Sequence, residues 1–330
     1  MNTSRVDNFH RLVQLTLGGL WIIDGLLQLQ PAMFSKEFVS NVLAPVIQGQ
    51  PHLAGSLLRL NENLISVHVG AWNLVFAGVQ LLIGFGIIMR PTLKPALAIS
   101  FAWSLGVWTL GEGFGMLFTG SASPLTGAPG AVILYLALGL IVWPRPIRDN
   151  QGRAVSLASH GLLGDRPTTW LWAGLWTVSG ILWLLPANLT KGALGAQIIQ
   201  AGQGQPSWLS SLDNSVGSSL KASGLHLGVC LFVVSLVIGF GPIVSERRTL
   251  FVVIGGALSC VYWVFGQAFG GIFTVFSHGT GTDLNSGPLI VIIGICLVTW
   301  KSTEAKMSSG QTCTNNPFVW RPVELEGVMN

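Results

Sequence analysis

The sequence predicts an all-α, polytopic membrane protein with about eight transmembrane helices, arranged as two parallel four-helix repeats. Composition is the first observation behind this prediction. Only 9% of the 330 residues are charged and 50% are hydrophobic, whereas a typical soluble domain has about 25% charged residues. The mean hydropathy is +0.60. The net charge of +4 requires no nucleic-acid partner, because the basic residues mark membrane topology.

Apolar segments are the second observation. Eight of them span or nearly span a bilayer whose apolar core is about 30 Å thick. They cover residues 12–30, 64–89, 95–119, 128–143, 170–186, 224–244, 250–273 and 285–300. We expect the fourth and eighth, which are short, to extend into the loops before them. We expect the first to be retained rather than cleaved as a signal peptide, because it contains Asp24 and no small-residue cleavage site follows it.

Basic residues predict the orientation, because cytoplasmic loops carry an excess of Lys and Arg. With both termini in the cytoplasm, the outer face has only Lys36, Arg59, Lys191 and Lys221. The inner face then has Arg5, Arg11, Arg90, Lys94, Arg145, Arg148, Arg153, Arg166, Arg247, Arg248, Lys301, Lys306 and Arg321. We therefore expect a multi-pass protein of the cell membrane with cytoplasmic N- and C-termini.

An internal duplication is the third observation. The segment GLWIIDGLLQLQPA (19–32) aligns with GLWTVSGILWLLPA (174–187), 155 residues later and without gaps. The same offset pairs QGQP at 48–51 and 203–206, IGFG at 83–86 and 238–241, and GEGFGMLFT at 111–119 with GQAFGGIFT at 266–274. Each repeat has four helices, so both copies enter the membrane from the same side. The expected domains are repeat one (1–143), a cytoplasmic linker (144–169), repeat two (170–300) and a cytoplasmic tail (301–330).

The two longest loops are predicted to lie outside the cell, at 31–63 and 187–223. Each is expected to contain a short interfacial helix, SKEFVSNVLAPVI (35–47) in the first and TKGALGAQIIQ (190–200) in the second, because apolar residues recur at three and four positions. Besides the lipid bilayer, we expect these loops to contact other membrane or extracytoplasmic proteins.

Three ionisable side chains fall in the outer half of the first repeat: Asp24, His68 and Glu112. Ionisable groups inside membrane spans are costly and indicate function. The second repeat lacks all three, since Ser179, Ser223 and Gln267 stand at the equivalent positions. The first repeat is therefore predicted to be the active one. Trp103 and Trp108 lie near this set and are the candidate aromatic ligand-binding residues.

Each of these residues also has a purely structural interpretation. Glu112 could line a wet vestibule, Asp24 could hydrogen-bond a neighbouring helix, and His68 could cap a helix end. Tryptophans anchor membrane interfaces, and the glycines around Glu112 allow close helix approach.

Several chemistries could use this set. A quinone head group needs hydrogen bonds and proton exchange, which His68 and a desolvated carboxyl could supply. His with carboxylates also suits Fe, Mn or Zn, although no HxxH or ExxH spacing supports a metal. A transporter could use the carboxylates as coupling sites, but polar residues are sparse in the inner halves of the spans. Bis-histidine haem is the weakest option, and no CxxC, Rossmann fingerprint, P-loop or Ser-His-Asp pattern occurs.

The first helix, LGGLWIIDGLLQLQP, together with four helices per unit and a glycine-rich third helix, resembles the DoxX/DoxD-like membrane family. The resemblance is strongest over 12–143 and repeats at 167–300. It implies a four-helix membrane unit, and some members of that family are subunits of thiosulfate:quinone oxidoreductase. No catalytic residue is transferred from it.

These observations favour an integral membrane subunit associated with redox chemistry and interacting with a quinone. Asp24 or Glu112 would exchange the proton, and His68 would bind a carbonyl oxygen. The alternative is a non-enzymatic membrane anchor or assembly partner of a larger complex that works through its outer loops. A transporter of a small solute or metal is a third, weaker alternative.

Overall fold

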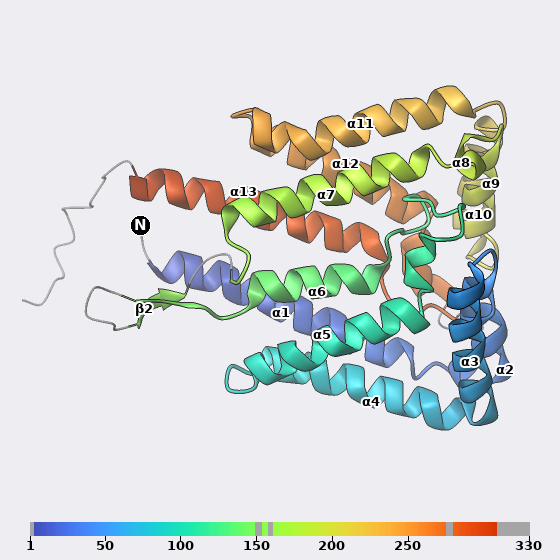
Figure 1. Ribbon diagram of the computed structural model, residues 1–330, viewed down its shortest axis with the longest axis horizontal. Helices are drawn as coiled ribbons and strands as arrows, with labels where there is room; N and C mark the ends of the chain where they lie inside the picture. Colours follow the sequence, from blue (N-terminus) through green and yellow to red (C-terminus); the bar gives the residue numbers. More distant parts are fainter. Residues whose placement is uncertain (1–2, 149–153, 158–160, 275–279, 309–330) are drawn as a thin grey trace, which may run out of the picture.

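The computed structural model describes residues 3–148, 154–157, 161–274 and 280–308. Its long helices lie side by side in one bundle (Figure 1). They are α1 (Thr3–Leu27), α4 (Val69–Ile88), α5 (Leu93–Leu110), α6 (Ala131–Val142), α7 (Asp165–Trp183), α11 (Leu225–Val244), α12 (Arg248–Phe265) and α13 (Ser286–Ser308). Within the described residues, α4, α5, α11 and α12 are long and apolar enough to cross a membrane. The prediction of a helical membrane protein is confirmed to this extent.

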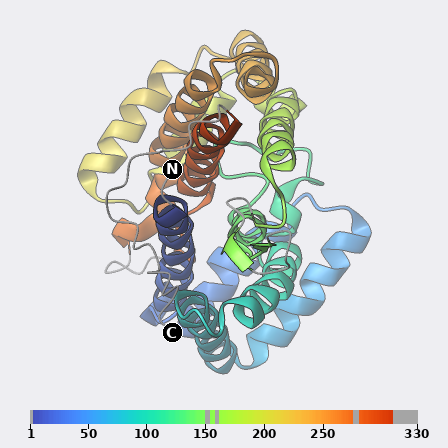
Figure 2. The same cartoon turned by 90° about the vertical axis from the view of Figure 1, so that its left-hand side faces the viewer.

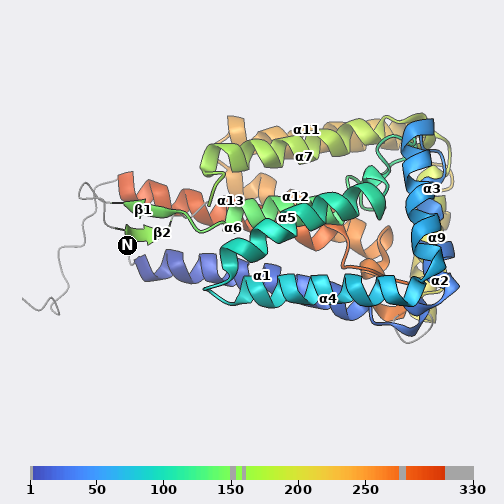
Figure 3. The same cartoon turned by 60° about the horizontal axis from the view of Figure 1, so that its bottom comes forward.

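A layer of shorter helices crosses one end of the bundle roughly at right angles (Figures 1 and 3). It comprises α2 (Lys36–Phe38), α3 (His52–Val67), α8 (Pro186–Leu189), α9 (Ala193–Ala201) and α10 (Ser207–Ser219). The short helix expected at 35–47 is divided into α2, a π-turn (Val39–Leu43) and a 3₁₀ turn (Pro45–Ile47), while the one expected at 190–200 forms α9. The sequence analysis missed α3 and α10. We call this group the end layer.

The central helices of the bundle are α6 and α13 (Figure 2). Nine of the twelve residues of α6 are buried, as expected for a helix that is apolar on every side. The surrounding core combines residues from both halves of the chain, including Leu17, Leu138, Trp172 and Ile293. The two expected bundles therefore share one hydrophobic core.

Two predicted spans were too long. The third span was expected at 95–119, but α5 ends at Leu110, and the seventh was expected at 250–273, but α12 ends at Phe265. After each helix the chain forms a 3₁₀ segment, η4 (Phe114–Met116) and η5 (Ala268–Thr274). Several residues in these segments have positive φ, which an α-helix cannot accommodate. The residues of these turns are mostly apolar, so the sequence pattern predicted a continuation of the helix.

The opposite end of the bundle holds the turn between α4 and α5, the segment between α6 and α7, and the beginning of α1 (Figure 1). The segment between α6 and α7, expected to be a cytoplasmic linker, includes an antiparallel ribbon of β1 (Pro146–Arg148) and β2 (Ala154–Leu157). Arg248 at the start of α12 is buried and forms a 2.8 Å ion pair with Asp165 at the start of α7.

Candidate functional site

Glu112 lies in the turn that follows α5 and reaches the beginning of α6. Its Oε1 accepts a hydrogen bond from the backbone N–H of Val132, at 3.1 Å. The first N–H groups of a helix have no partner inside the helix, and their dipoles favour a negative group. Gly130, just before α6, has φ 110°, and a Cβ there would collide with the Glu112 carboxyl group. Glu112 therefore caps α6 from a distance of twenty residues along the chain.

Gln267 makes the equivalent contact in the second half. Its Oε1 accepts from the N–H of Gly287, at 3.0 Å, near the start of α13. The neighbouring tryptophans match as well, because Trp108 donates to the Pro129 carbonyl at 2.8 Å and Trp263 to the Leu284 carbonyl at 2.7 Å. An uncharged amide thus performs the same structural task as the carboxyl group. The acidity of Glu112 is not needed for this cap.

The structure brings Asp24 and Glu112 close enough to interact electrostatically, which the sequence alone did not predict. Asp24, on α1, is 2% exposed, and the carboxylates of Glu112 and Asp283 both act on it electrostatically. Its carboxyl group also lies beside the hydroxyl of Tyr135, on α6. The ring of Tyr135 packs against Trp21 with centroids 4.8 Å apart. We call Asp24, Glu112, Asp283 and Tyr135 the acidic site.

Asp283 comes from the loop before α13, in the other half of the chain. Its Oδ1 accepts from the N–H of Asn285 at 2.6 Å, and its Oδ2 accepts from the Thr282 hydroxyl at 3.0 Å. The sequence analysis did not select Asp283 or Tyr135. Asp283 lies outside every apolar segment, so the search for ionisable residues inside spans passed over it. Tyr135 could have been noticed in the sequence, because it is one of only two tyrosines and lies inside the predicted span 128–143.

Burial dominates the electrostatics of the two loop carboxyls. Burial, and after it the neighbouring Asp283 carboxylate, raises the pKa of Glu112 to about 8, against the opposing effect of the Val132 N–H. Burial likewise raises the pKa of Asp283, although its hydrogen bonds from Asn285 and Thr282 oppose the rise. Among the groups identified as acting on these carboxyls, none is a Lys, Arg or His. Glu112 therefore retains its proton near neutral pH.

The structure does not bring His68 into this site. His68 is exposed, with φ −141° and ψ 57°, at the junction where α3 ends and α4 begins. The second span begins only at Val69, so the structure places His68 beside the end layer, and its role in binding a ligand stays a prediction. This position matches the alternative interpretation of a residue at a helix end.

The two candidate tryptophans occupy different surroundings. Trp108 adjoins the acidic site, because a Cβ on Gly130 would contact both its ring and the Glu112 carboxyl group. Trp103 packs instead on Phe76, with ring centroids 5.8 Å apart. Phe76 in turn contacts Trp72 and Phe38. Trp103 thus belongs to an aromatic cluster that extends into the end layer.

The end layer is attached to the acidic site through the QGQP motif. Gln50, its third residue, donates to the carbonyl of Gly113 at 2.8 Å. Asn61 of α3 donates to the carbonyl of Leu110, the last residue of α5, at 3.2 Å. These two bonds hold the layer against the turn that contains Glu112.

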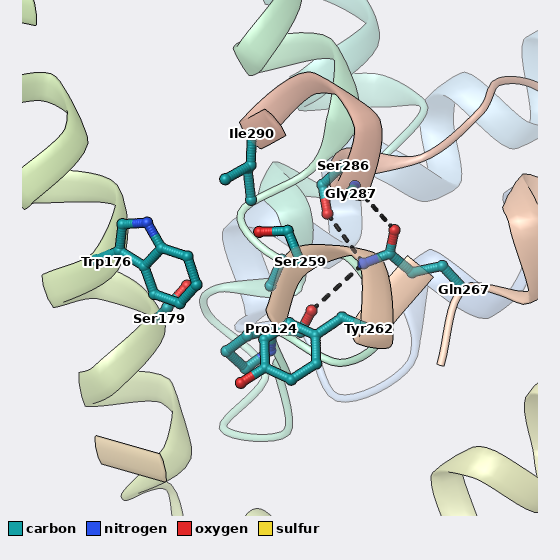
Figure 4. A pocket seen from close by; sticks show the side chains of 10 residues that line it. Pro124, Trp176, Ser179, Ser259, Tyr262, Gln267, Ser286, Gly287 and Ile290 are labelled. Carbon is teal, nitrogen blue, oxygen red and sulfur yellow. Dashed lines mark hydrogen bonds between the residues drawn. The ribbon is translucent and has the colours of Figure 1, made fainter. Parts of the chain in front are cut away.

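A small cavity occupies the equivalent place in the second half (Figure 4). Its walls include Trp176, Ser179, Gln267 and Ile290, which lie 155 positions after Trp21, Asp24, Glu112 and Tyr135. The space available to the centre of a water molecule is about 10 Å³, enough for about one water. The second half thus has a small, uncharged counterpart of the acidic site.

Each of the two sites includes residues from a loop of the other half of the chain. Pro124 and Ala128, from the loop before α6, line the cavity of the second half. Asp283, from the loop before α13, completes the acidic site of the first half. The two loops touch, because a Cβ on Gly127 would overlap the side chain of Asn285. Each half therefore completes the site of the other.

The fold and this site define a helical membrane protein with a buried group of carboxyls shared between two halves. Comparisons with models of known protein families, with curated proteins and with solved structures find no match to this chain. In the described part of the chain, no group of three or more His, Cys, Asp or Glu residues has an arrangement that could hold a metal ion.

Proposed function

We propose that this chain is an eight-span membrane protein made of two tandem, parallel four-helix repeats, with both termini in the cytoplasm. Helix bounds support the duplication, since α3 and α10, α5 and α12, and α6 and α13 each begin 155 residues apart. The paired hydrogen bonds of Glu112 and Gln267 support it independently. The basic turns between spans gather at the bundle end opposite the end layer, which supports the orientation.

The protein acts as a quinone-interacting subunit of a membrane redox system, and the acidic site exchanges the protons. A quinone takes up two electrons and two protons to become a quinol, so its site needs a group that releases protons in a water-poor environment. The electrons come from a separate redox partner. Glu112 and Asp24 serve as proton donors, and the hydroxyl of Tyr135 is available to a carbonyl oxygen in place of His68.

One observation carries this proposal. Glu112 and Gln267 make the same helix-capping hydrogen bond, yet the first half uses a carboxyl group at this position, and the Asp24 and Asp283 carboxyls interact with it electrostatically. Burying like charges together is costly. Because the neutral amide meets the structural need, the acidity is retained for chemistry.

The decisive experiment measures bound quinone per chain after purification from native membranes. We expect near-stoichiometric quinone in the wild type and in Glu37→Gln, which makes the same chemical change at an exposed position of α2. We expect Glu112→Gln and Asp24→Asn to lose most of it. Retention of quinone in both of these variants, or its absence from the wild type, would overturn the proposal.

A non-enzymatic anchor or assembly partner is the second candidate. The end layer favours it, because the layer lies across one end of the bundle (Figure 3) and many of its side chains are exposed. In that case a partner complex would co-purify equally well with the wild type and with Glu112→Gln, whereas substitutions in residues 31–63 or 187–223 would disrupt it.

A further inference from the structure

Helix α3 has an apolar stripe that no other part of the described chain covers. Its five residues, Leu53, Leu57, Leu60, Leu64 and Val67, are between 43% and 84% exposed. They are spaced alternately by four and three positions, so they lie in one row along the helix. A row of this size at the surface of a protein indicates a contact with an apolar phase or partner.

The faces of α3 are arranged as on a helix at the edge of a membrane protein. At about 100° per residue, Leu58 and Ile65 form the buried face. The exposed polar residues Ser56, Arg59 and Asn63 lie roughly 140° to one side of it, and the apolar stripe lies roughly 130° to the other side. A helix that rests beside the protein, with water above it and lipid below it, needs these three faces in this order.

The position of α3 fits the same environment. It crosses the end of the bundle at right angles to the spans (Figures 1 and 3). Its last residue, Val67, is followed within two positions by the first residue of α4, which can cross a membrane. Along α4, Leu74, Leu82 and Phe85 are exposed. The apolar stripe of α3 is thus continuous along the chain with a surface that faces lipid.

We propose that α3 is an interfacial helix whose Leu53–Val67 stripe is embedded in the outer boundary of the bilayer. Lipid acyl chains cover the stripe, and the polar face remains in contact with water. The embedded helix holds the end layer at a defined depth, and with it the hydrogen bonds from Gln50 and Asn61 to the turn beside Glu112. This inference is independent of the proposed quinone chemistry.

Helix α10 serves as a natural comparison. It begins 155 residues after α3. The positions that correspond to the stripe are Trp208, Leu212, Ser215 and Ser219 on α10, and Ala222 just beyond its end. Three leucine or valine positions are therefore replaced by serine or alanine. We infer that α10 lies less deeply in the lipid than α3.

Site-directed fluorescence quenching tests this inference. A polarity-sensitive label is attached to single cysteines at Leu60→Cys on the stripe, Asn63→Cys on the polar face and Ser215→Cys on α10. The background replaces all four native cysteines, at positions 230, 260, 296 and 313. The full chain is reconstituted in phosphatidylcholine vesicles with or without brominated acyl chains.

The expected result is at least two-fold quenching by brominated lipid at position 60, with little quenching at 63 and an intermediate value at 215. Equal, low quenching at 60 and 63, with equal access to a water-soluble quencher, would overturn the proposal. Efficient disulfide cross-linking of Leu60→Cys between two chains would also overturn it, because a second copy would then cover the stripe. Position 63 shows that each labelled protein is folded and correctly inserted, since its label must remain accessible from water.

Discussion

Glu112 and Gln267 make the same contact with different chemistry, and this comparison separates structure from function at the level of single residues. Each side chain accepts a hydrogen bond from the second residue of the following helix, at 3.1 Å and 3.0 Å respectively. The carboxyl group adds a titratable proton, which the amide lacks. Different substitutions at position 112 can therefore remove the titratable proton alone, or both the proton and the hydrogen bond to the start of α6.

We predict that Glu112→Gln changes the stability of the folded protein by less than about 1 kcal/mol, because the amide retains the hydrogen bond to Val132. Glu112→Ala leaves that N–H without a partner and should cost about 1–3 kcal/mol. Thermal unfolding in detergent compares the two variants. If Gln is as damaging as Ala, the capping role assigned to the side chain is wrong.

Stability should fall as the pH rises through the neutral range. Burial raises the pKa of Glu112 from an ordinary 4.5 to about 8, so between these values the folded protein binds a proton that the unfolded chain has released. Stability is then greatest below about pH 4.5 and is lost up to about pH 8. Asp283, whose pKa is also raised, acts in the same direction.

The measurement is the unfolding temperature from pH 5 to pH 9, for the wild type and for Glu112→Gln. We expect the variant to lose part of the pH dependence. The control is Glu37→Gln, which should follow the wild-type curve. Parallel curves for the wild type and Glu112→Gln would show that Glu112 does not hold a proton in the folded protein.

At the scale of the elements, the turns after α5 and α12 determine the positions of Glu112 and Gln267. Both turns contain residues with positive φ, and both pack closely against the loop that follows. A Cβ on Gly115 would collide with the carbonyl of Pro129, and one on Gly270 would collide with the carbonyl of Asp283. Gly115 and Gly270, which lie 155 positions apart, therefore keep these turns against the loops that line both sites.

Gly130→Ala should be among the most damaging single changes in this region. The residue has φ 110°, and a methyl group there would overlap the Glu112 carboxyl group. We expect a loss of more than about 2 kcal/mol, which combines backbone strain with overpacking. Gly120→Ala is the matched control, because Gly120 has φ 73° but open space around its Cβ position. Its cost should be limited to about 1–2 kcal/mol. Thermal unfolding measures both, and equal losses would mean that contact with Glu112 is unimportant.

At the scale of the whole molecule, the two halves are interlocked rather than adjacent. They share one core around α6 and α13, and each contributes a loop to the site of the other. The acidic site therefore requires both halves, although three of its four members belong to the first.

We predict that the halves stay together after the chain is cut between them. A protease site inserted at residues 149–153, between β1 and β2, would yield two fragments that co-purify in mild detergent and keep the unfolding temperature within a few degrees. The control is the same insertion without protease treatment. Separation of the fragments under these conditions would contradict the shared core.

The sequence by itself determined the helical membrane class, since composition and apolar segments follow directly from the need to satisfy every backbone hydrogen bond inside lipid. It also located Asp24 and Glu112, because a carboxyl group in an apolar segment stands out without any knowledge of packing. The sequence can therefore single out a residue by the composition of its own segment.

Only the tertiary structure decided which groups meet. It placed His68 at a helix junction beside the end layer, ended α5 before Glu112, and added Asp283 from the other half of the chain. It also revealed the exposed stripe on α3, a helix that was not expected within the outer loop. Contacts between distant segments depend on how loops cross and on which helix faces remain uncovered. The order of residues along the chain does not specify either of these.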